Sequence, residues 1–251
     1  MAGTCRVAVL IPALDEEEAL PLVLREIPSD VVEFVLVVDN GSTDRTAEEA
    51  RAAGAEVVRE PRRGYGRACL TGLAVLLERG VPGRRKLGAD DVVVFLDGDH
   101  SDYPADLVSI LEPVLADEAD LVIGSRMLSP ESRRALLPQA RLGNRLAGVL
   151  LRLLFGARMT DLGPLRAIRV RALRHLAMRD ENYGWTVEMQ IKAAVAGLRW
   201  REVPVRYRSR IGRSKISGTL SGSLRAAWKI LGWITIWRLR LLTGRGIPRY
   251  R

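Results

Sequence analysis

Short apolar runs alternate with amphipathic stretches through the first half of the chain. Runs rich in β-branched residues predict buried strands, and they occupy residues 6–11, 33–38, 55–59, 92–96 and 120–123. Between them, helical spacing and acidic first turns predict helices that begin at Asp15 and cover 44–53, 64–78 and 105–116. This alternation predicts an α/β fold with a doubly wound, mostly parallel sheet flanked by helices.

The apolar run 92–96 ends abruptly in Asp97-Gly98-Asp99. In open α/β sheets, ligands bind at the carboxyl ends of the strands, and two carboxylates one residue apart can hold a hard divalent cation there. Two other strands are also followed by acids, at Asp15 and Asp39. An ordinary acidic turn explains the 97–99 segment equally well when it is taken alone.

The pattern changes after Arg126. We expect helices over 139–155, 185–196 and 219–242, and strands over 165–170 and 200–207. The first of these helices carries arginines near one face and leucines on the other. This pattern fits a helix at a membrane surface and also a helix packed on the sheet, and packing is the favoured interpretation.

The last helix interleaves apolar residues with cations. Its apolar positions recur at helical spacing, at Leu224, Trp228, Leu231, Ile234, Trp237 and Leu241. Three tryptophans and flanking cations favour a membrane interface, whereas core packing or a homodimer seam explains the pattern equally well. The most apolar run, 230–237, is too short to span a bilayer, so we expect any membrane contact to be peripheral.

Charge divides the chain into two unlike halves. Residues 1–125 hold 12 lysines and arginines against 24 acids, and residues 126–251 hold 27 against 6. An acidic half suits a metal site, and a basic half suits phosphates or an anionic membrane surface. Nucleic-acid binding is disfavoured, because the acidic half would repel the polymer and no nucleic-acid module is recognisable.

Composition and cysteine use place the protein among intracellular globular proteins. Hydrophobic residues make up 47% and charged residues 27% of the 251 residues, which is typical of a folded domain. Cys5 and Cys69 lack metal-ligand spacing and predict free thiols in a reducing compartment. Because the first residues run straight into a strand, we expect no signal peptide.

Two cationic loops are candidate phosphate sites. The loop over 61–67 combines glycines and arginines at a predicted helix start, where backbone amides suit phosphate oxygens. The segment 208–215 holds four cations in eight residues, with glycine and serine between them. A solvated basic loop is the simpler interpretation of the first, and a flexible anion clamp is our interpretation of the second.

Two carboxylates of the second half are further candidates. Asp161 lies in a predicted turn, and Glu188 is the only acid between Glu181 and Glu202, on an apolar helix. A surface position or an ion pair with one of the many arginines would also explain Glu188.

Taken together, these motifs resemble the family 2 glycosyltransferases of GT-A fold, and within them the polyprenyl-phosphate branch that includes dolichyl-phosphate mannose synthase. The likeness covers nearly the whole chain. It is carried by 11–17 (Ile-Pro-Ala-Leu-Asp-Glu-Glu), 38–44 (Val-Asp-Asn-Gly-Ser-Thr-Asp), 64–68 (Gly-Tyr-Gly-Arg-Ala), 97–99 (Asp-Gly-Asp), 124–126 (Gly-Ser-Arg), 160–161 (Thr-Asp) and 212–215 (Gly-Arg-Ser-Lys).

The resemblance implies a nucleoside diphosphate sugar, linked to UDP or GDP, bound across the acidic edge. Its implied contacts are Pro12, Leu14, Glu16, Asp39, Arg67, Asp97, Gly98 and Asp99. Asp99 would ligate Mg²⁺ or Mn²⁺, assisted by Asp97 or Ser101, and Asp97 is as plausible a donor contact as a second ligand. The implied contacts of the donor diphosphate or of an acceptor phosphate are Arg126, Arg210, Arg213 and Lys215.

The implied architecture is a catalytic domain over 1–218, followed by an amphipathic helix and tail over 219–251. Within the domain, 1–126 would bind the nucleotide sugar and 127–218 would form the acceptor side. The implied reaction is inverting, metal-dependent transfer to a polyprenyl phosphate at the cytoplasmic membrane face. A lipid phosphate needs no general base, whereas a soluble hydroxyl acceptor would need Asp161 or Glu188 in that role.

Some positions depart from the family pattern. Asn40 stands where relatives often carry a second aspartate, and Gly163-Pro164-Leu165-Arg166 replaces a Gly-Phe-Arg/Lys run. The C-terminal spanning helices of many lipid-linked members are also missing. A related nucleotidyltransferase is disfavoured, because acids occupy the place after the first strand where its glycine-rich, lysine-bearing signature would lie.

Overall fold

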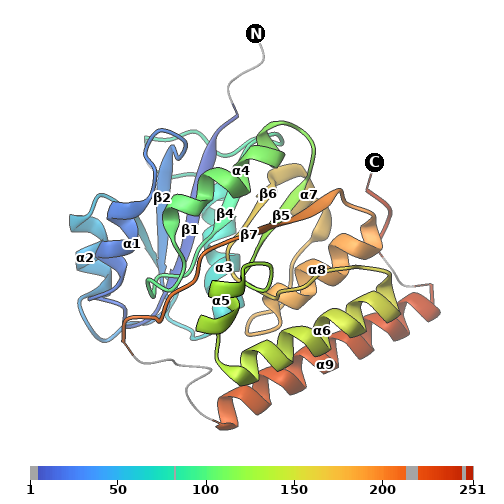
Figure 1. Ribbon diagram of the computed structural model, residues 1–251. Coiled ribbons are helices and arrows are strands. Elements are labelled where there is room, and N and C mark those ends of the chain that lie inside the picture. Colours follow the sequence, from blue (N-terminus) through green and yellow to red (C-terminus); the bar gives the residue numbers. More distant parts are fainter. Residues whose placement is uncertain (1–4, 82, 213–219, 245–246, 251) are drawn as a thin grey trace.

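Seven strands form one mixed sheet in the computed structural model, which describes residues 5–81, 83–212, 220–244 and 247–250 (Figure 1). The strand order is β3-β2-β1-β4-β6-β5-β7. The strands are β1 (Val7–Ala13), β2 (Phe34–Asp39), β3 (Glu56–Arg59), β4 (Val92–Phe95), β5 (Leu121–Ser125), β6 (Arg166–Arg169) and β7 (Trp200–Pro204). All neighbouring pairs are parallel except those made by β6, which is antiparallel to β4 and β5. The predicted mostly parallel sheet is therefore confirmed.

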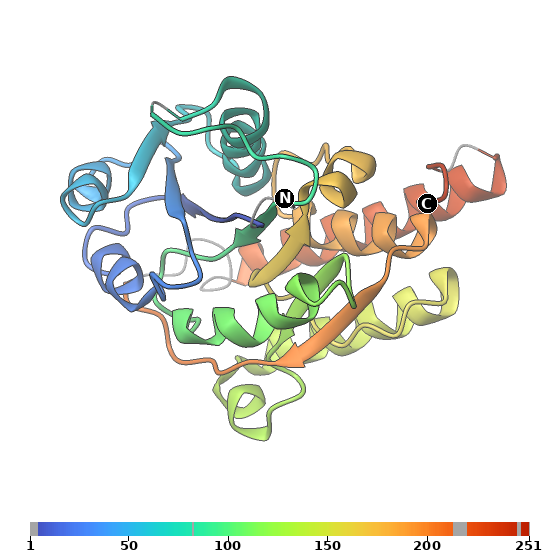
Figure 2. The ribbon, with the colours of Figure 1, turned by 90° about the horizontal axis from the view of Figure 1, so that it is seen from above.

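Helices cover both faces of this sheet (Figure 2). Successive strand residues point to opposite faces, so the apolar runs supply two cores. One core includes side chains of α1 (Leu20–Glu26), α2 (Thr46–Ala52) and α4 (Leu107–Leu115). The other includes α3 (Tyr65–Ala74), the π-helix η1 (Val75–Arg79), α7 (Val170–Leu176) and α8 (Trp185–Ala196).

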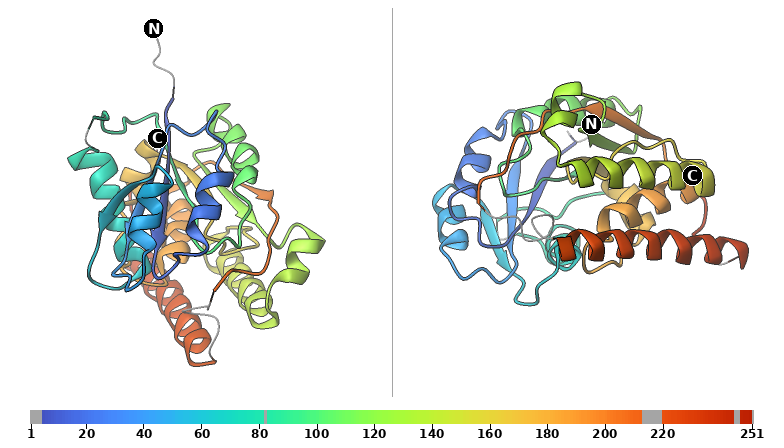
Figure 3. Two further views of the ribbon diagram at one scale, coloured as in Figure 1. Left: turned by 90° about the vertical axis from the view of Figure 1, so that its left-hand side faces the viewer. Right: turned by 60° about the horizontal axis from the view of Figure 1, so that its bottom comes forward.

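Two long helices, α6 (Pro138–Phe155) and α9 (Leu220–Leu242), lie side by side outside α8 (Figure 1). Two views at right angles place both helices toward the carboxyl ends of the parallel strands (Figures 1 and 3). The short elements η2 (Pro104–Asp106) and α5 (Pro130–Ala135) complete the described secondary structure.

Strand β1 continues through Pro12 to Ala13, beyond the end predicted at residue 11. Proline lacks the amide that a sheet ladder needs. Here the pairing of β1 with β4 ends at Leu10, and on the other side Pro12 still lies in register with Val38 of β2. Pro12 therefore lies beyond the last residue of β1 that pairs with β4, where no backbone amide is needed for that pairing.

The acidic stretch after β1 forms a loop, and α1 begins only at Leu20. Its backbone amides bond to side chains of the loop after β2 and of the first residue of α2. Glu16 N donates to Thr46 Oγ1 at 2.8 Å, and Glu17 N donates to Asp44 Oδ2 at 3.2 Å. The helix start predicted at Asp15 is thus wrong, and the acids are held at the sheet edge.

Helix α9 is anchored in the core on one side. Ile234 and Trp237 are buried in the same cluster as α8, and Trp233 Nε1 donates to Asp180 Oδ2 at 2.6 Å. For these residues the core-packing interpretation is correct, whereas Trp228 is 81% exposed. Within the described part of the chain, no helix is long and apolar enough to cross a membrane.

Candidate active site

A cavity of about 450 Å³ opens at the carboxyl ends of β1 and β4, a typical size for a small-molecule site. Seven of its lining residues were predicted from the sequence as donor or phosphate contacts: Pro12, Leu14, Glu16, Asp97, Gly98, Asp99 and Arg210. The others are Ala13, Asp15, Asn40, Arg63, Gly64, Tyr65, Asn182 and Tyr183. The fold therefore brings residues from both charge halves of the chain into one cavity.

Arg210 lies between acidic side chains that follow two different strands, β1 and β4. Its Nη2 lies 2.6 Å from Asp99 Oδ2 and 3.4 Å from Glu16 Oε1. The other oxygen of Asp99 accepts a hydrogen bond from Ser101 N at 2.9 Å. The positive charge of Arg210 is thus already balanced by Glu16, which follows β1, and Asp99, which follows β4.

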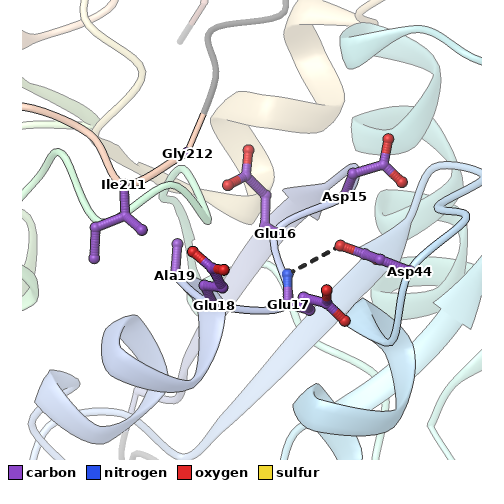
Figure 4. A pocket seen from close by; sticks show the side chains of 8 residues that line it. All are labelled: Asp15, Glu16, Glu17, Glu18, Ala19, Asp44, Ile211 and Gly212. Atoms are coloured by element: carbon purple, nitrogen blue, oxygen red, sulfur yellow. Dashed lines mark hydrogen bonds between the residues drawn. The ribbon is translucent and has the colours of Figure 1, made fainter.

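The backbone around Arg210 is laid along the loop after β4. Arg208 N donates to Ser101 O at 2.9 Å, and Ile211 N donates to Asp99 O at 3.0 Å. Glu16 points toward the segment of Ile211 and Gly212, across a smaller acidic pocket of about 210 Å³ (Figure 4). These contacts fix the cationic segment against the acidic edge.

Asp97 is the second acid of the cavity floor. Its Oδ1 is buried and has no hydrogen-bond partner among the described residues. Burial raises the pKa of Asp97 to about 7, and the negative charge of Asp99 adds to the increase, whereas the Tyr65 hydroxyl and the charges of Arg210 and Arg126 oppose it. Such an oxygen needs a proton, a donor hydroxyl or a cation for a partner.

This donor set fits a divalent cation that shares its ligands with a substrate. Asp97 and Asp99 offer two carboxylates at one strand end. Among the described residues no group of three or more histidine, cysteine, aspartate or glutamate side chains is arranged to hold a metal ion. Mg²⁺ is commonly held by one or two carboxylates together with substrate phosphates and water, so the chain alone need not supply a complete ligand set.

Arg126 and Asp161 form a buried pair beside this site. Asp161 Oδ2 accepts hydrogen bonds from Arg126 N and Nε, each at 2.8 Å, and Asp161 Oδ1 accepts from Arg126 Nη2 at 2.8 Å and from Asn144 Nδ2 at 2.7 Å. Burial lowers the pKa of Arg126, but Asp161, together with Asp102 and Tyr207, more than offsets this, so the pKa of Arg126 lies above the usual value. The guanidinium also stacks over the ring of Tyr207 at 5.0 Å. Asp161 therefore orients Arg126, and its oxygens are engaged.

Glu188 is fully buried in a second pair. It lies 2.7 Å from Lys192 Nζ, and its Oε2 accepts hydrogen bonds from Arg179 N at 3.1 Å and Asp180 N at 2.7 Å. It does not line the cavity. A catalytic role for Glu188 stays a prediction; in this structure its carboxylate holds the chain before α8 in place.

That chain, residues 179–184, forms one wall of the cavity through Asn182 and Tyr183. Asp180 supports it: Oδ1 accepts hydrogen bonds from Asn182 N at 2.7 Å and Gly184 N at 3.0 Å. The wall also presses on the start of α3, where a Cβ on Gly66 would lie 2.0 Å from Asp180 O. The wall is thus clamped between α3 and α9.

Comparison with known proteins decides the family. The family described as glycosyl transferase family 2 matches residues 8–177. The chain belongs to this family.

Relatives of this glycosyltransferase cover most of its length. An uncharacterised glycosyltransferase of Mycobacterium tuberculosis is 37% identical over 235 residues, which span 92% of this chain and all of that protein. The undecaprenyl-phosphate mannosyltransferase of Micrococcus luteus is 36% identical, over 86% of this chain and 90% of its own. The dolichyl-phosphate hexose transferase of Haloferax volcanii is 34% identical, over 86% and 89%. The resemblance to the polyprenyl-phosphate branch is confirmed.

A solved structure confirms the GT-A fold of the glycosyltransferase. Glucosyl-3-phosphoglycerate synthase from Mycobacterium tuberculosis superimposes with a TM-score of 0.70 at 23% identity, covering 94% of this chain and 80% of that one. The same enzyme has been crystallised with Mn²⁺, UDP-glucose and phosphoglyceric acid.

Several predicted site residues of the glycosyltransferase lie outside the cavity lining. Asp39 accepts a hydrogen bond from Ser42 N at 2.9 Å, and Arg67 pairs with Glu181. Ser101 contributes its backbone amide to Asp99. Ligand contacts by these three stay predictions, and Arg213 and Lys215 lie outside the described residues.

Sequence reasoning overlooked Asp102. Neither of its buried oxygens has a hydrogen-bond partner among the residues that the structure describes. Burial, and then the charges of Asp97 and Asp99, raise the pKa of Asp102 well above its usual value, although Arg126 opposes this. A third acid so close to Asp99 in the sequence was an available signal. No signal in the sequence pointed to the wall residues Asn182 and Tyr183.

Asn40 explains one departure from the family pattern. Its Nδ2 donates to Glu60 O at 3.1 Å and to Arg62 O at 2.8 Å, and its Oδ1 accepts from Gly64 N at 2.8 Å. An aspartate cannot donate to two carbonyls.

Asn40→Asp is therefore expected to lower the free energy of unfolding by about 1–3 kcal/mol, measured by urea denaturation. The exposed Gln139→Glu is the matched control; an equal change in both variants would contradict this role.

Trp233 is expected to act on the cavity through Asp180. Trp233→Phe keeps an aromatic ring but removes the N–H donor, so the 179–184 wall loses one support. We expect the KM for the donor to rise about fivefold to tenfold, with a smaller change in kcat, in steady-state assays. The exposed Trp228→Phe, on the same helix, should leave both constants unchanged. Unaltered donor KM in a folded Trp233→Phe protein would refute the coupling.

Proposed function

We propose that this glycosyltransferase transfers a sugar, with inversion, from a nucleoside diphosphate sugar to a polyprenyl phosphate. The observation that carries the proposal is the cavity in which Asp97, Asp99 and Glu16 face Arg210. Carboxylates on one side suit a divalent cation on the donor diphosphate, and a guanidinium on the other suits a phosphate. Two unlike charged groups are thus accommodated within one cavity.

Donor binding follows from the acidic edge. In this proposal Pro12, Leu14 and Glu16 contact the nucleoside, as the family resemblance implies, and Asp97 lies beside them. Asp99, with Asp97, would hold Mg²⁺ or Mn²⁺. When bound, the metal would neutralise charge on the leaving diphosphate.

Acceptor chemistry is constrained by the carboxylates that the sequence offered as general bases. Asp161 is engaged by Arg126 and Asn144, and Glu188 by Lys192. An acceptor that is already anionic needs no proton removed, which favours a phosphate over a hydroxyl. Relatives named for undecaprenyl phosphate and dolichyl phosphate, at 36% and 34% identity, support a lipid phosphate.

The reaction is a single displacement. A phosphate oxygen of the acceptor forms a bond to the anomeric carbon, the bond between that carbon and the diphosphate oxygen breaks, and the nucleoside diphosphate leaves with the electron pair. Arg210, which pairs with Asp99 in this structure, would bind a phosphate of the donor or of the acceptor. The acceptor places the reaction at the cytoplasmic face of a membrane in this proposal.

A partition assay tests the proposal. Purified enzyme is incubated with Mg²⁺ or Mn²⁺, radiolabelled UDP- or GDP-sugars, and either a polyprenyl phosphate or the matching polyprenol. Label should enter the organic phase only with the phosphorylated lipid. Label that reaches only a water-soluble phosphorylated acceptor, such as phosphoglyceric acid, would replace the lipid by a soluble substrate. Organic-phase label with the polyprenol would remove the phosphate requirement.

A further inference from the structure

Glu26, the last residue of α1, binds two segments that lie far from it in the sequence. Its Oε1 lies 2.8 Å from His100 Nε2, and its Oε2 accepts a hydrogen bond from Arg208 Nη2 at 2.8 Å. Because an ionised carboxylate can only accept, His100 is the donor in the first contact. The two partners are 74 and 182 positions away along the chain, so only the tertiary fold brings the three residues together.

The two partners of Glu26 also bind each other. Arg208 Nε donates to His100 O at 2.7 Å, so each of the three residues is bonded to the other two. The guanidinium of Arg208 also lies 4.3 Å from the ring centroid of Tyr103, which it covers. We call Glu26, His100 and Arg208 the Glu26 clamp. Because its three contacts form a closed triangle, moving one member disturbs both of the others.

Local preferences oppose this arrangement at two points. The end of a helix favours cations over acids, because its free carbonyls carry partial negative charge, yet Glu26 ends α1. His100 adopts a φ of 61°, in the left-handed region that few residues other than glycine occupy. Backbone of this kind persists where surrounding contacts impose it, and it recurs at functional sites. Contacts within the clamp therefore offset two local costs.

Glu26 carries its negative charge at neutral pH. Burial raises the pKa of this carboxyl, but the hydrogen bonds from His100 and Arg208 more than offset the increase, so the pKa lies below its usual value. The clamp is thus held by charge as well as by hydrogen bonds.

The clamp lies next to two site residues without lining the cavity. His100 directly follows Asp99, and Arg208 precedes Arg210 by two positions. The segment after β7, drawn in orange, runs back toward α1, drawn in blue (Figure 2). Its backbone hydrogen bonds to the loop after β4 begin at Arg208 and end beside Asp99. The clamp therefore fixes one end of the contact that places Arg210 against Asp99.

We propose that Glu26 is a positioning residue of the donor site, which holds the loop of Asp99 against the segment of Arg210. The inference rests on the proposed function, in which Asp99 holds the cation and Arg210 binds a phosphate. Glu26 touches no ligand in this proposal. It acts by keeping the two charged groups at a fixed separation, and a displacement of about 1 Å can lower a rate about a hundredfold.

Calorimetric titration with UDP and with GDP, each with and without Mn²⁺, tests the clamp in the absence of an acceptor. Glu26→Ala is expected to weaken the Mn²⁺-dependent binding about tenfold and the metal-free binding less. Glu26→Gln, whose amide oxygen can still accept one hydrogen bond, should fall between Glu26→Ala and the unaltered chain. Arg208→Ala should reproduce the loss, and the double variant should add nothing to it, because both changes open the same clamp.

The matched control is Glu118→Ala. Glu118 is also an exposed glutamate paired with an arginine, Arg201 of β7, but the pair lies outside the cavity. The control should bind nucleotide and Mn²⁺ like the unaltered chain. In thermal melts all the variants should unfold close to the unaltered chain, because exposed ion pairs contribute little to stability.

The clamp is overturned if Glu26→Ala binds nucleotide and Mn²⁺ like the control, or if the losses in Glu26→Ala and Arg208→Ala simply add. It is also overturned if weaker binding accompanies a large drop in melting temperature, since Glu26 would then only stabilise the fold. An unaltered chain that binds neither nucleotide would refute the donor site, and the clamp with it. An unaltered chain that binds nucleotide but transfers no sugar to a polyprenyl phosphate would refute only the proposed acceptor.

Discussion

Asp99→Asn is expected to lower kcat/KM for sugar transfer by about a thousandfold or more, with the protein still folded. Asparagine retains an oxygen that can accept the hydrogen bond from Ser101 N, so the loop after β4 keeps its shape. It loses the charge that balances Arg210 and that would hold a divalent cation. Steady-state transfer assays measure the activity, and calorimetric titration with donor and Mn²⁺ measures binding.

The control is Asp90→Asn, because Asp90 is an exposed acid paired with Arg171 on the surface. It should leave both activity and metal-dependent donor binding unchanged. If Asp99→Asn retained more than a tenth of the activity, the metal assignment would lose its basis.

Arg210→Ala is expected to change the stability of the ligand-free protein only slightly but to lower the rate of sugar transfer strongly. The ion pair with Asp99 is partly exposed, so its loss should cost about 1 kcal/mol in the absence of ligands. Mg²⁺ or Mn²⁺ alone should then stabilise the variant more than the unaltered chain, because a cation no longer competes with the guanidinium for Asp99. Transfer should nevertheless fall about a hundredfold or more, since the phosphates lose a charged partner.

Thermal melts with and without the metal, together with transfer rates, test both parts. Arg206→Ala is the matched control: Arg206 lies in the same segment but pairs with Asp106 outside the cavity. If the metal stabilised Arg210→Ala no more than the control, competition for Asp99 would be excluded.

Much of the fold follows from local pattern. The β-branched run at 92–96 predicted β4, and the amphipathic spacing predicted α6 and α9 to within a residue or two. The errors lie where distant side chains decide the backbone. The amides of Asp15, Glu16 and Glu17 donate to the side chains of Ser42, Thr46 and Asp44. These contacts join segments almost thirty residues apart, so the local helix signal failed.

The site residues that directly follow strands or belong to a sequence motif were predictable from the sequence. Asp97, Asp99 and Glu16 follow parallel strands and must meet at one edge, and Arg210 belongs to a dense cationic segment. The partners of the isolated acids were only partly predictable. Lys192, at i+4 from Glu188 on the same helix, was a local sign of an ion pair, whereas Asp161 and Arg126 meet only through the tertiary fold.

The most direct test of the central claim is the structure of the reaction product. Enzyme, donor, Mg²⁺ or Mn²⁺ and a polyprenyl phosphate are incubated, and the lipid fraction is analysed by mass spectrometry and by ³¹P and ¹H NMR. We predict a sugar joined to the lipid through one phosphodiester, with the anomeric configuration opposite to that of the donor. The yield should depend on Asp99 and Arg210. Unchanged polyprenyl phosphate beside a consumed donor, or a product with retained configuration, would contradict the account.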